Sequence, residues 1–257
     1  LELDLDPDKR AESENAIEAF RQAARALPYF SSAVRRIEMA EEGAIEKIFA
    51  PVETAIAGAD GVFALNQTGA TPERAIAFDL GSAARLVIRL DAGSPVAFED
   101  SLPRLWCLAP LEETLRCAWI LDGRDLEIDP GRTRLNGDQS TRFNAYGDAL
   151  RDRLLALHAL TGEAWDLAAA SLGLCEGKAG QDTFWKALSE LFLQDASCPI
   201  AQLLHKDGRG IAGLIRDLPI IATGLPAPFD LPVRGADIQF YPNGILALKK
   251  VQITASS

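Results

Sequence analysis

Cysteine, histidine and methionine are scarce in this sequence: there are four cysteines, two histidines and one methionine among 257 residues. The cysteines (Cys107, Cys117, Cys175 and Cys198) include no C-x-x-C pair, which excludes a disulfide-dense scaffold and is typical of reduced core thiols. Long apolar runs and a signal peptide are also missing. We therefore expect a cytoplasmic protein that makes no membrane contact.

Basic residues are outnumbered, with 26 Lys and Arg against 37 Asp and Glu, so the net charge is -11. A surface of this sign repels a phosphate backbone, and we expect no nucleic-acid partner. Hydrophobic residues make up 48% and charged residues 25%, which is the composition of a globular protein and excludes intrinsic disorder. The sequence opens at Leu1 and has Met39 as its single methionine, from which we expect an excerpt of a longer polypeptide.

Hydrophobic periodicity predicts a mixture of helices and strands. Ile17 and Phe20 fall on one face of a helix over 8–27, and Leu154 lies on the apolar face of a helix over 141–160 that Gly162 ends. The remaining predictions are strands at 34–39 and 45–49 that form a β-hairpin, another such pair of strands at 75–79 and 85–90 around Gly81-Ser82, and strands at 104–108, 117–121 and 126–128. A loop at 55–71, helices at 163–172 and 183–193, and a hairpin of 237–241 with 245–249 that turns at Asn243-Gly244 are also predicted.

These elements predict the α+β class, with a mixed or antiparallel sheet covered by helices and then a smaller helical and hairpin region. We expect one α+β domain over residues 1–175 and a C-terminal region over 176–257. The predicted helices over 8–27 and 141–160 each carry an apolar stripe that needs a sheet to bury against. We therefore expect them to cover one face of a sheet built from residues 75–135.

The familiar catalytic and cofactor motifs are incomplete. Gly208–Gly213 fits G-x-G-x-x-G, but Lys206-Asp207 precede it where a buried strand is required, so a turn is favoured. Gly173–Lys178 is one residue short of a P-loop and lacks its Ser or Thr, so a polar loop is favoured. Neither histidine has a metal-ligand spacing, and no G-x-S-x-G is present. We expect no cofactor in this chain and no activity from it in isolation.

One long segment carries a resemblance. It runs from Leu102-Pro103-Arg104-Leu105-Trp106-Cys107-Leu108-Ala109-Pro110-Leu111-Glu112-Glu113-Thr114 through Trp119-Ile120-Leu121-Asp122-Gly123 to Leu126-Glu127-Ile128-Asp129-Pro130-Gly131-Arg132-Thr133-Arg134-Leu135, with Phe143-Asn144 opening the next helix. This segment resembles the middle, transducer region of the sacsin-like branch of the GHKL ATPases, the superfamily that includes the ninety-kilodalton heat-shock chaperones. In that family a strand ending in LPL-x-x-T is followed by NG-x-F-x-L-x-x-x-R. In this sequence Asp122 stands in place of the Asn of that pattern, and Leu126 stands near its Phe. The resemblance covers about residues 1–165.

The resemblance implies a module that couples the nucleotide state to a protein partner or client, in chaperone-like work. The family's ATP-site motifs are missing, so ATP and Mg²⁺ are expected in a domain that precedes Leu1 in the same polypeptide.

Two turn signals lie within the segment. Asp122-Gly123 predicts a two-residue turn between strands. Asp129-Pro130-Gly131 predicts a second turn, which places Arg132 and Arg134 in a loop before the long helix. Arginines on a loop at a sheet edge are suited to reaching a nucleotide γ-phosphate, and these two are the candidate phosphate contacts. The alternative is that they only solvate the turn or pair with nearby acids.

The leading hypothesis is therefore a regulatory, transducer fragment of a GHKL-type ATPase that is not catalytic alone. A second hypothesis is a stand-alone acidic protein-interaction module with no link to an ATPase. A small-molecule enzyme ranks last, because no motif supports it.

Overall fold

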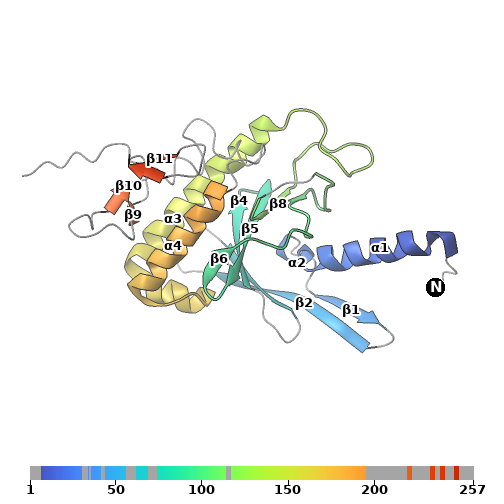
Figure 1. The fold of residues 1–257 in the computed structure, drawn as a ribbon, viewed down its shortest axis with the longest axis horizontal. Coiled ribbons are helices and arrows are strands. Elements are labelled where there is room, and N and C mark those ends of the chain that lie inside the picture. Colours follow the sequence, from blue (N-terminus) through green and yellow to red (C-terminus); the bar gives the residue numbers. More distant parts are fainter. Residues whose placement is uncertain are drawn as a thin grey trace, which may run out of the picture.

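The structure is a computed structural model of the chain. It describes residues 7–30, 34, 36–41, 44–55, 62–68, 74–113 and 117–194, and four short strands between 219 and 248. The helices are α1 (Pro7–Ala24), α2 (Leu27–Phe30), α3 (Ser140–Leu172) and α4 (Gly177–Gln194). Helices pack against a mixed sheet, so the predicted α+β class is confirmed (Figure 1).

The sheet has eight strands, in the order β1-β2-β3-β4-β5-β8-β7, and β6 also pairs with β5. Their bounds are β1 Ile37–Glu41, β2 Ala44–Ala55, β3 Val62–Thr68, β4 Arg74–Leu80, β5 Ala84–Asp91, β6 Ser94–Val96, β7 Leu105–Trp106 and β8 Ile120–Gly123. Neighbouring strands are antiparallel except β7 and β8, which are parallel. The predicted β1–β2 and β4–β5 hairpins are confirmed, whereas β3 occupies the stretch predicted as a loop.

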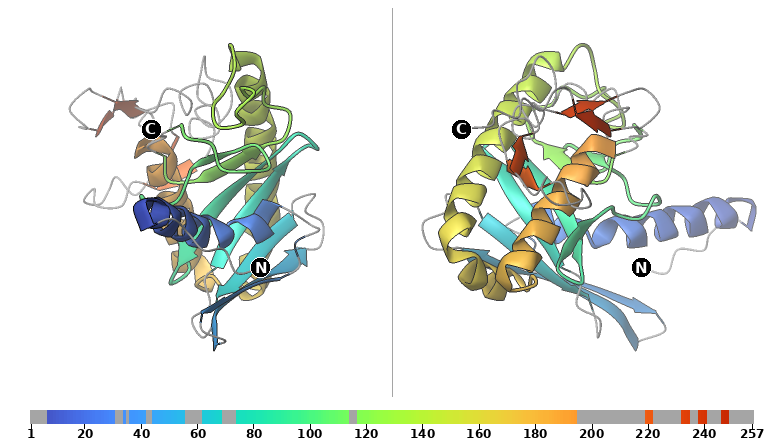
Figure 2. Two further views of the ribbon diagram at one scale, coloured as in Figure 1. Left: turned by 90° about the vertical axis from the view of Figure 1, so that its right-hand side faces the viewer. Right: turned by 60° about the vertical axis from the view of Figure 1, so that its left-hand side comes forward.

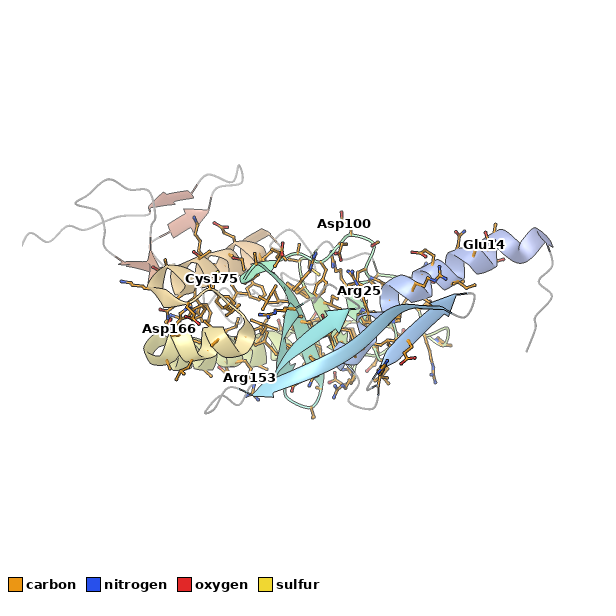
Figure 3. All side chains as sticks on the ribbon, turned by 90° about the horizontal axis from the view of Figure 1, so that it is seen from below. Glu14, Arg25, Asp100, Arg153, Asp166 and Cys175 are labelled. Atoms are coloured by element: carbon orange, nitrogen blue, oxygen red, sulfur yellow. The ribbon has the colours of Figure 1, made fainter. Side chains whose placement is uncertain are left out.

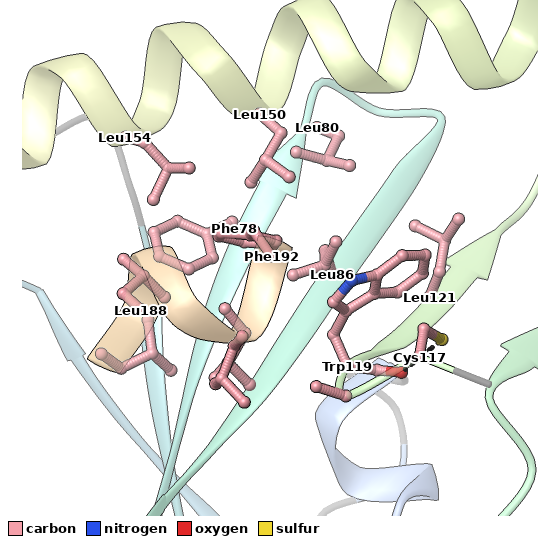
Figure 4. Close-up of a cluster of buried hydrophobic side chains, with 14 of the residues drawn as sticks. Phe78, Leu80, Leu86, Cys117, Trp119, Leu121, Leu150, Leu154, Leu188 and Phe192 are labelled. Atoms are coloured by element: carbon pink, nitrogen blue, oxygen red, sulfur yellow. Dashed lines mark hydrogen bonds between the residues drawn. The ribbon is translucent and has the colours of Figure 1, made fainter. Parts of the chain in front are cut away.

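The two faces of the sheet bury different side chains, because successive residues of a strand point to opposite sides. In β4, Ile76 and Phe78 lie in a large cluster with residues of α3 and α4 (Figure 4). Ala75 and Ala77 lie on the other face, in a smaller cluster with Tyr29 of α2. This face is therefore covered by α2 and the carboxyl end of α1, and the other face is covered by α3 and α4.

The expectation that helices 8–27 and 141–160 share one face was wrong. Leu154 of α3 is fully buried in the larger cluster, but Phe20 of α1 is 56% exposed and Ile17 is 50% exposed. Only the carboxyl end of α1 reaches the sheet, where Ala23 packs in the smaller cluster. The rest of α1, which carries Glu14, projects from the body (Figures 2 and 3).

Salt bridges fix the chain just after α1. Arg25 donates a hydrogen bond to the Glu99 carboxylate, and Arg89 Nη1 of β5 donates to Glu99 Oε1 at 3.0 Å. Glu99 therefore joins the end of α1 to the central strands through two guanidinium groups.

Helix α3 is longer than the sequence predicts. It continues past Gly162, which was expected to end it, and stops at Gly173, which caps the helix in a left-handed conformation with φ +67°. A single residue with non-helical backbone angles, Ala164, lies within α3. The helices predicted separately at 141–160 and 163–172 therefore form one helix with a kink. The helix resumes because Trp165 and Leu172 bury into the larger cluster beyond the break.

Helix α4 begins at Gly177, just after the domain boundary predicted between residues 175 and 176. Its residues Phe184, Leu188 and Phe192 lie in the same cluster as Leu154 of α3. Residues 177–194, which the sequence analysis places in the C-terminal region, therefore pack with the first domain.

Two hairpins follow in the C-terminal part of the described chain. Strand β9 (Pro219–Ile221) pairs with β10 (Pro232–Arg234), which the sequence does not predict. Strand β11 (Ile238–Phe240) pairs with β12 (Leu246–Leu248), as predicted, although the turn at Asn243-Gly244 lies outside the described residues.

Candidate functional site

The candidate arginines lie on a closed loop between β8 and α3. Asp129 donates its backbone N–H to the Arg134 carbonyl at 2.9 Å, and Asn136 donates to the Glu127 carbonyl at 2.8 Å. An isolated bridge between Ile128 and Leu135 closes the same loop, which we call the arginine loop (residues 127–136). The predicted strand 126–128 is thus reduced to one bridge, which forms the base of this loop.

The side chain of Asp129 shapes the tip of the arginine loop. Its Oδ1 accepts backbone hydrogen bonds from Thr133 at 2.8 Å and Arg134 at 3.0 Å. Its carbonyl accepts the Arg132 N–H at 2.9 Å, as the predicted turn requires. The backbone N–H groups of Arg134 and Thr133 hold the pKa of the Asp129 carboxyl below its ordinary value. The carboxylate is therefore charged at neutral pH and stabilises the turn.

The two arginines differ in their partners. Arg134 Nε donates to Glu112 Oε2 at 3.2 Å, and both side chains are exposed. Arg132 is exposed and has φ +58°, and within the described residues its guanidinium forms no hydrogen bond or ion pair. The alternative reading, pairing with a nearby acid, holds for Arg134, whereas Arg132 presents its donors to solvent.

The arginine loop is attached to the segment that precedes it in the motif. Glu112 donates its backbone N–H to the Thr133 carbonyl at 2.7 Å. Leu135 donates its N–H to the Glu113 carboxylate. Glu113 and Leu135 are 22 positions apart in the sequence, so these contacts join two separate stretches of the motif into one structural unit.

Within the motif, the structure differs most from the prediction at Asp122. Asp122 and Gly123 were predicted to form a turn, but both belong to β8, and Asp122 is fully buried. Its Oδ1 accepts the backbone N–H of Leu108 at 2.9 Å, and its Oδ2 lies 3.5 Å from Arg124 Nε. A buried carboxylate with these two donors is satisfied without a turn. Sequence reasoning missed it because the donor Leu108 comes from a different loop.

The amino end of α3 also holds the arginine loop. Gln139 is buried, and its side-chain amide donates to the Asn136 carbonyl. Its Oε1 accepts hydrogen bonds from the Glu127 N–H at 3.3 Å and from Arg142 Nη1 at 2.9 Å. One glutamine side chain therefore fixes both ends of the loop.

Two proton donors contact Asp125 and Leu126, the residues just before the arginine loop. Tyr146 donates its hydroxyl to Asp125, and burial, followed by this hydrogen bond, raises the pKa of Tyr146 far above its ordinary value. Burial, followed by the charges of Asp122 and Asp125, raises the pKa of the Cys107 thiol. Both groups keep their protons at neutral pH, so neither is set up as a nucleophile.

The remaining sequence candidates lie away from this unit or outside the described residues. Residues 173–176 form the loop that joins α3 to α4, as predicted, whereas Gly177 and Lys178 are the first two residues of α4. His158 lies on α3 with its ring 5.0 Å from the Trp185 ring, and burial lowers its pKa. Gly208–Gly213 and His205 fall outside the described residues.

Among the described residues, no group of three or more His, Cys, Asp or Glu side chains is placed to hold a metal ion. None of the described helices has the length and apolar character needed to cross a bilayer. No protein-family model, curated protein or solved structure matches the chain.

Proposed function

We propose that this chain is the transducer region of a sacsin-like GHKL ATPase, working in the cytoplasm with an ATP-binding domain of the same polypeptide. That domain would hold ATP and Mg²⁺, and this chain would couple the nucleotide state to a protein partner or client. Alone, the chain is not catalytic.

The observation that carries the proposal is the contrast between Arg132 and Arg134. A tight turn holds Arg132 at an exposed tip, and its guanidinium has no partner among the described residues. A planar guanidinium with several donors matches phosphate oxygens and stabilises negative charge that develops during phosphoryl transfer. Since Glu112 already engages Arg134, Arg132 is the arginine available for this role.

The packing of the motif gives a second line of support. The segments that carry the resemblance contact one another through Glu112, Glu113 and Asp122, and Phe143 of α3 is buried beside them in the larger cluster. These contacts fix the backbone that carries Arg132, which reduces the cost of ordering the loop against a ligand.

The decisive experiment compares Arg132→Ala with Arg134→Ala in the longer polypeptide that contains the ATP-binding domain. We expect Arg132→Ala to lower ATP turnover on the order of 10²–10³-fold and Arg134→Ala to change it far less. Thermal midpoints should stay close to that of the parent protein, because both side chains are exposed. Equal turnover in the parent protein and the Arg132→Ala variant would overturn the proposal.

The isolated chain provides an independent check. Calorimetry should detect no low-micromolar binding of ATP to residues 1–257, and no steady hydrolysis should follow. Tight binding with turnover would place a nucleotide site within this chain and contradict the assignment.

A stand-alone protein-interaction module is the second candidate, and α1 favours it. Ile17 and Phe20 expose apolar surface on a helix that projects from an acidic protein. If this candidate is correct, Ile17→Ser and Phe20→Ser variants lose a protein partner, while both arginine variants behave like the parent chain.

A further inference from the structure

The loop that follows β7 contains a strained turn at Leu108. Leu108 has φ +63°, a conformation that a residue with a Cβ adopts rarely. Its side chain is 72% exposed, so burial of the leucine does not hold the backbone in place. The restraint must come from hydrogen bonds to the backbone of the turn.

Asp122 supplies that restraint from within the sheet. Its carboxylate accepts the Leu108 N–H, and the turn is closed by the Cys107 N–H, which donates to the Ala109 carbonyl at 2.9 Å. Asp122 pairs with Arg85 in the β5–β8 ladder and is fully buried, so its position is fixed by the sheet. The strained turn is thereby tied to the central sheet.

The restrained loop then leads directly to the groups that hold the arginine loop. Leu111 donates its N–H to the Leu105 carbonyl at 2.9 Å, which brings the chain back beside β7. The next two residues, Glu112 and Glu113, make the contacts to Thr133, Arg134 and Leu135 described above. A displacement of the turn at Leu108 would therefore move the groups that brace the arginine loop.

We propose that Asp122 is a positioning residue for Arg132, acting through the turn at Leu108 and the two glutamates that follow it. Asp122 does not touch the phosphate. Its contribution is to keep the arginine loop in one orientation relative to the sheet. The consequence for turnover rests on the proposed function, whereas the coupling between Asp122 and the arginine loop is a property of this chain alone.

Hydrogen exchange in the 257-residue chain tests the coupling. Asp122→Ala removes the acceptor, and we expect the Leu108 and Leu135 amides to exchange on the order of tenfold faster. Asp122→Asn keeps an oxygen acceptor and should restore slow exchange. Amides of β4, such as those of Ile76 and Phe78, serve as controls and should be unchanged. Unchanged exchange at Leu135 in the alanine variant would overturn the proposal.

Asp122→Ser covers the case in which the alanine variant does not fold. Its hydroxyl stays polar beside Arg124 but is too short to reach the Leu108 N–H, so it should speed exchange at Leu135 as alanine does. Exchange in the serine variant equal to that of the parent chain would also overturn the proposal.

Glycine at position 108 provides a double-mutant cycle. Leu108→Gly relieves the strain, because glycine adopts positive φ readily. If Asp122 acts by holding the strained turn, the effect of Asp122→Ala on Leu135 exchange will be smaller in the glycine background. Equal effects in the two backgrounds would show that Asp122 acts by another route.

Turnover in the longer polypeptide separates this proposal from the proposed function. We expect Asp122→Ala to lower kcat while leaving the KM for ATP unchanged, Asp122→Asn to rescue it, and Asp122→Ala to add no further loss to Arg132→Ala. If Arg132→Ala does not change turnover, the proposed function is wrong, but the exchange result is unaffected. Additive losses in the double variant defeat the positioning role alone.

Discussion

Arg85 and Asp79 face each other across the β4–β5 hairpin and form a two-pronged ion pair, with Nε–Oδ1 at 2.6 Å and Nη2–Oδ2 at 3.0 Å. The remaining nitrogen, Nη1, donates to the Tyr29 carbonyl of α2 at 2.7 Å. Arg124 Nη2 donates to the next carbonyl, that of Phe30, at 3.1 Å. Two guanidinium groups therefore satisfy carbonyls at the end of α2, where a helix leaves acceptors without partners.

Replacing Arg85 by Lys should lower the free energy of unfolding by about 2 kcal/mol, because an ammonium group cannot reproduce the fork and reach Tyr29 as well. Urea denaturation measures the difference. Arg134→Lys is the matched control, since its pair with Glu112 is exposed, and it should change stability by less than about 1 kcal/mol. Equal losses in the two variants would contradict the anchoring role of Arg85.

Replacing a buried and an exposed phenylalanine should change the free energy of unfolding by very different amounts. Phe78→Ala should cost about 3–5 kcal/mol, because Phe78 is 1% exposed and its removal leaves a cavity in the larger cluster. Phe20→Ser should stay within about 0.5 kcal/mol, since Phe20 lies on the projecting part of α1. Chemical denaturation of the isolated chain measures both. A large loss for Phe20→Ser would show that α1 is covered in solution.

Glycines 162 and 173 form another contrasting pair. Gly162→Ala should stabilise the chain by about 0.5–1 kcal/mol, because Gly162 lies within α3 and a Cβ there meets no atom within 4 Å. Gly173→Ala should destabilise it by at least about 1 kcal/mol, because Gly173 has φ +67° and a Cβ would collide with the Arg74 guanidinium. Thermal midpoints that move in the same direction would contradict this assignment.

Burial of His158 makes stability depend on pH. Its folded-state pKa lies below the ordinary value of 6.5, so the unfolded chain binds this proton more readily than the folded chain. The contribution to stability is complete above about pH 6.5 and is lost as the pH falls through the lower folded-state pKa. Urea midpoints of the parent chain and His158→Gln should diverge below that pH. Parallel midpoints across the acidic range would contradict the burial of His158.

The hairpins and the arginine loop could be predicted because their signals are local. The β4–β5 hairpin follows from alternating side chains around Gly81, whose φ is +68°, and the turn at Asp129 uses its own carboxylate on nearby N–H groups. The α+β class follows from the same patterns. These features need no partner from distant parts of the chain.

The errors arise where a distant partner decides the local structure. Asp122-Gly123 has the composition of a turn, but the Leu108 N–H and Arg124 satisfy the buried aspartate within a strand. The apolar stripe of α1 predicts burial, yet the sheet face near it is filled by α2 and the end of α1. The pairing of Arg134 with Glu112, which separates the two candidate arginines, is also set by tertiary structure.

Strand β7 has a consequence for self-association. It lies at one edge of the sheet, and only Leu105 and Trp106 belong to it. Pro103 just before it has no backbone N–H to offer, and the chain turns away immediately after it through the bridge of Trp106 with Pro110. An incoming strand from another molecule would find only a few backbone groups to pair with on this side. The edge is thereby protected against the strand-to-strand stacking that starts fibrillar aggregates.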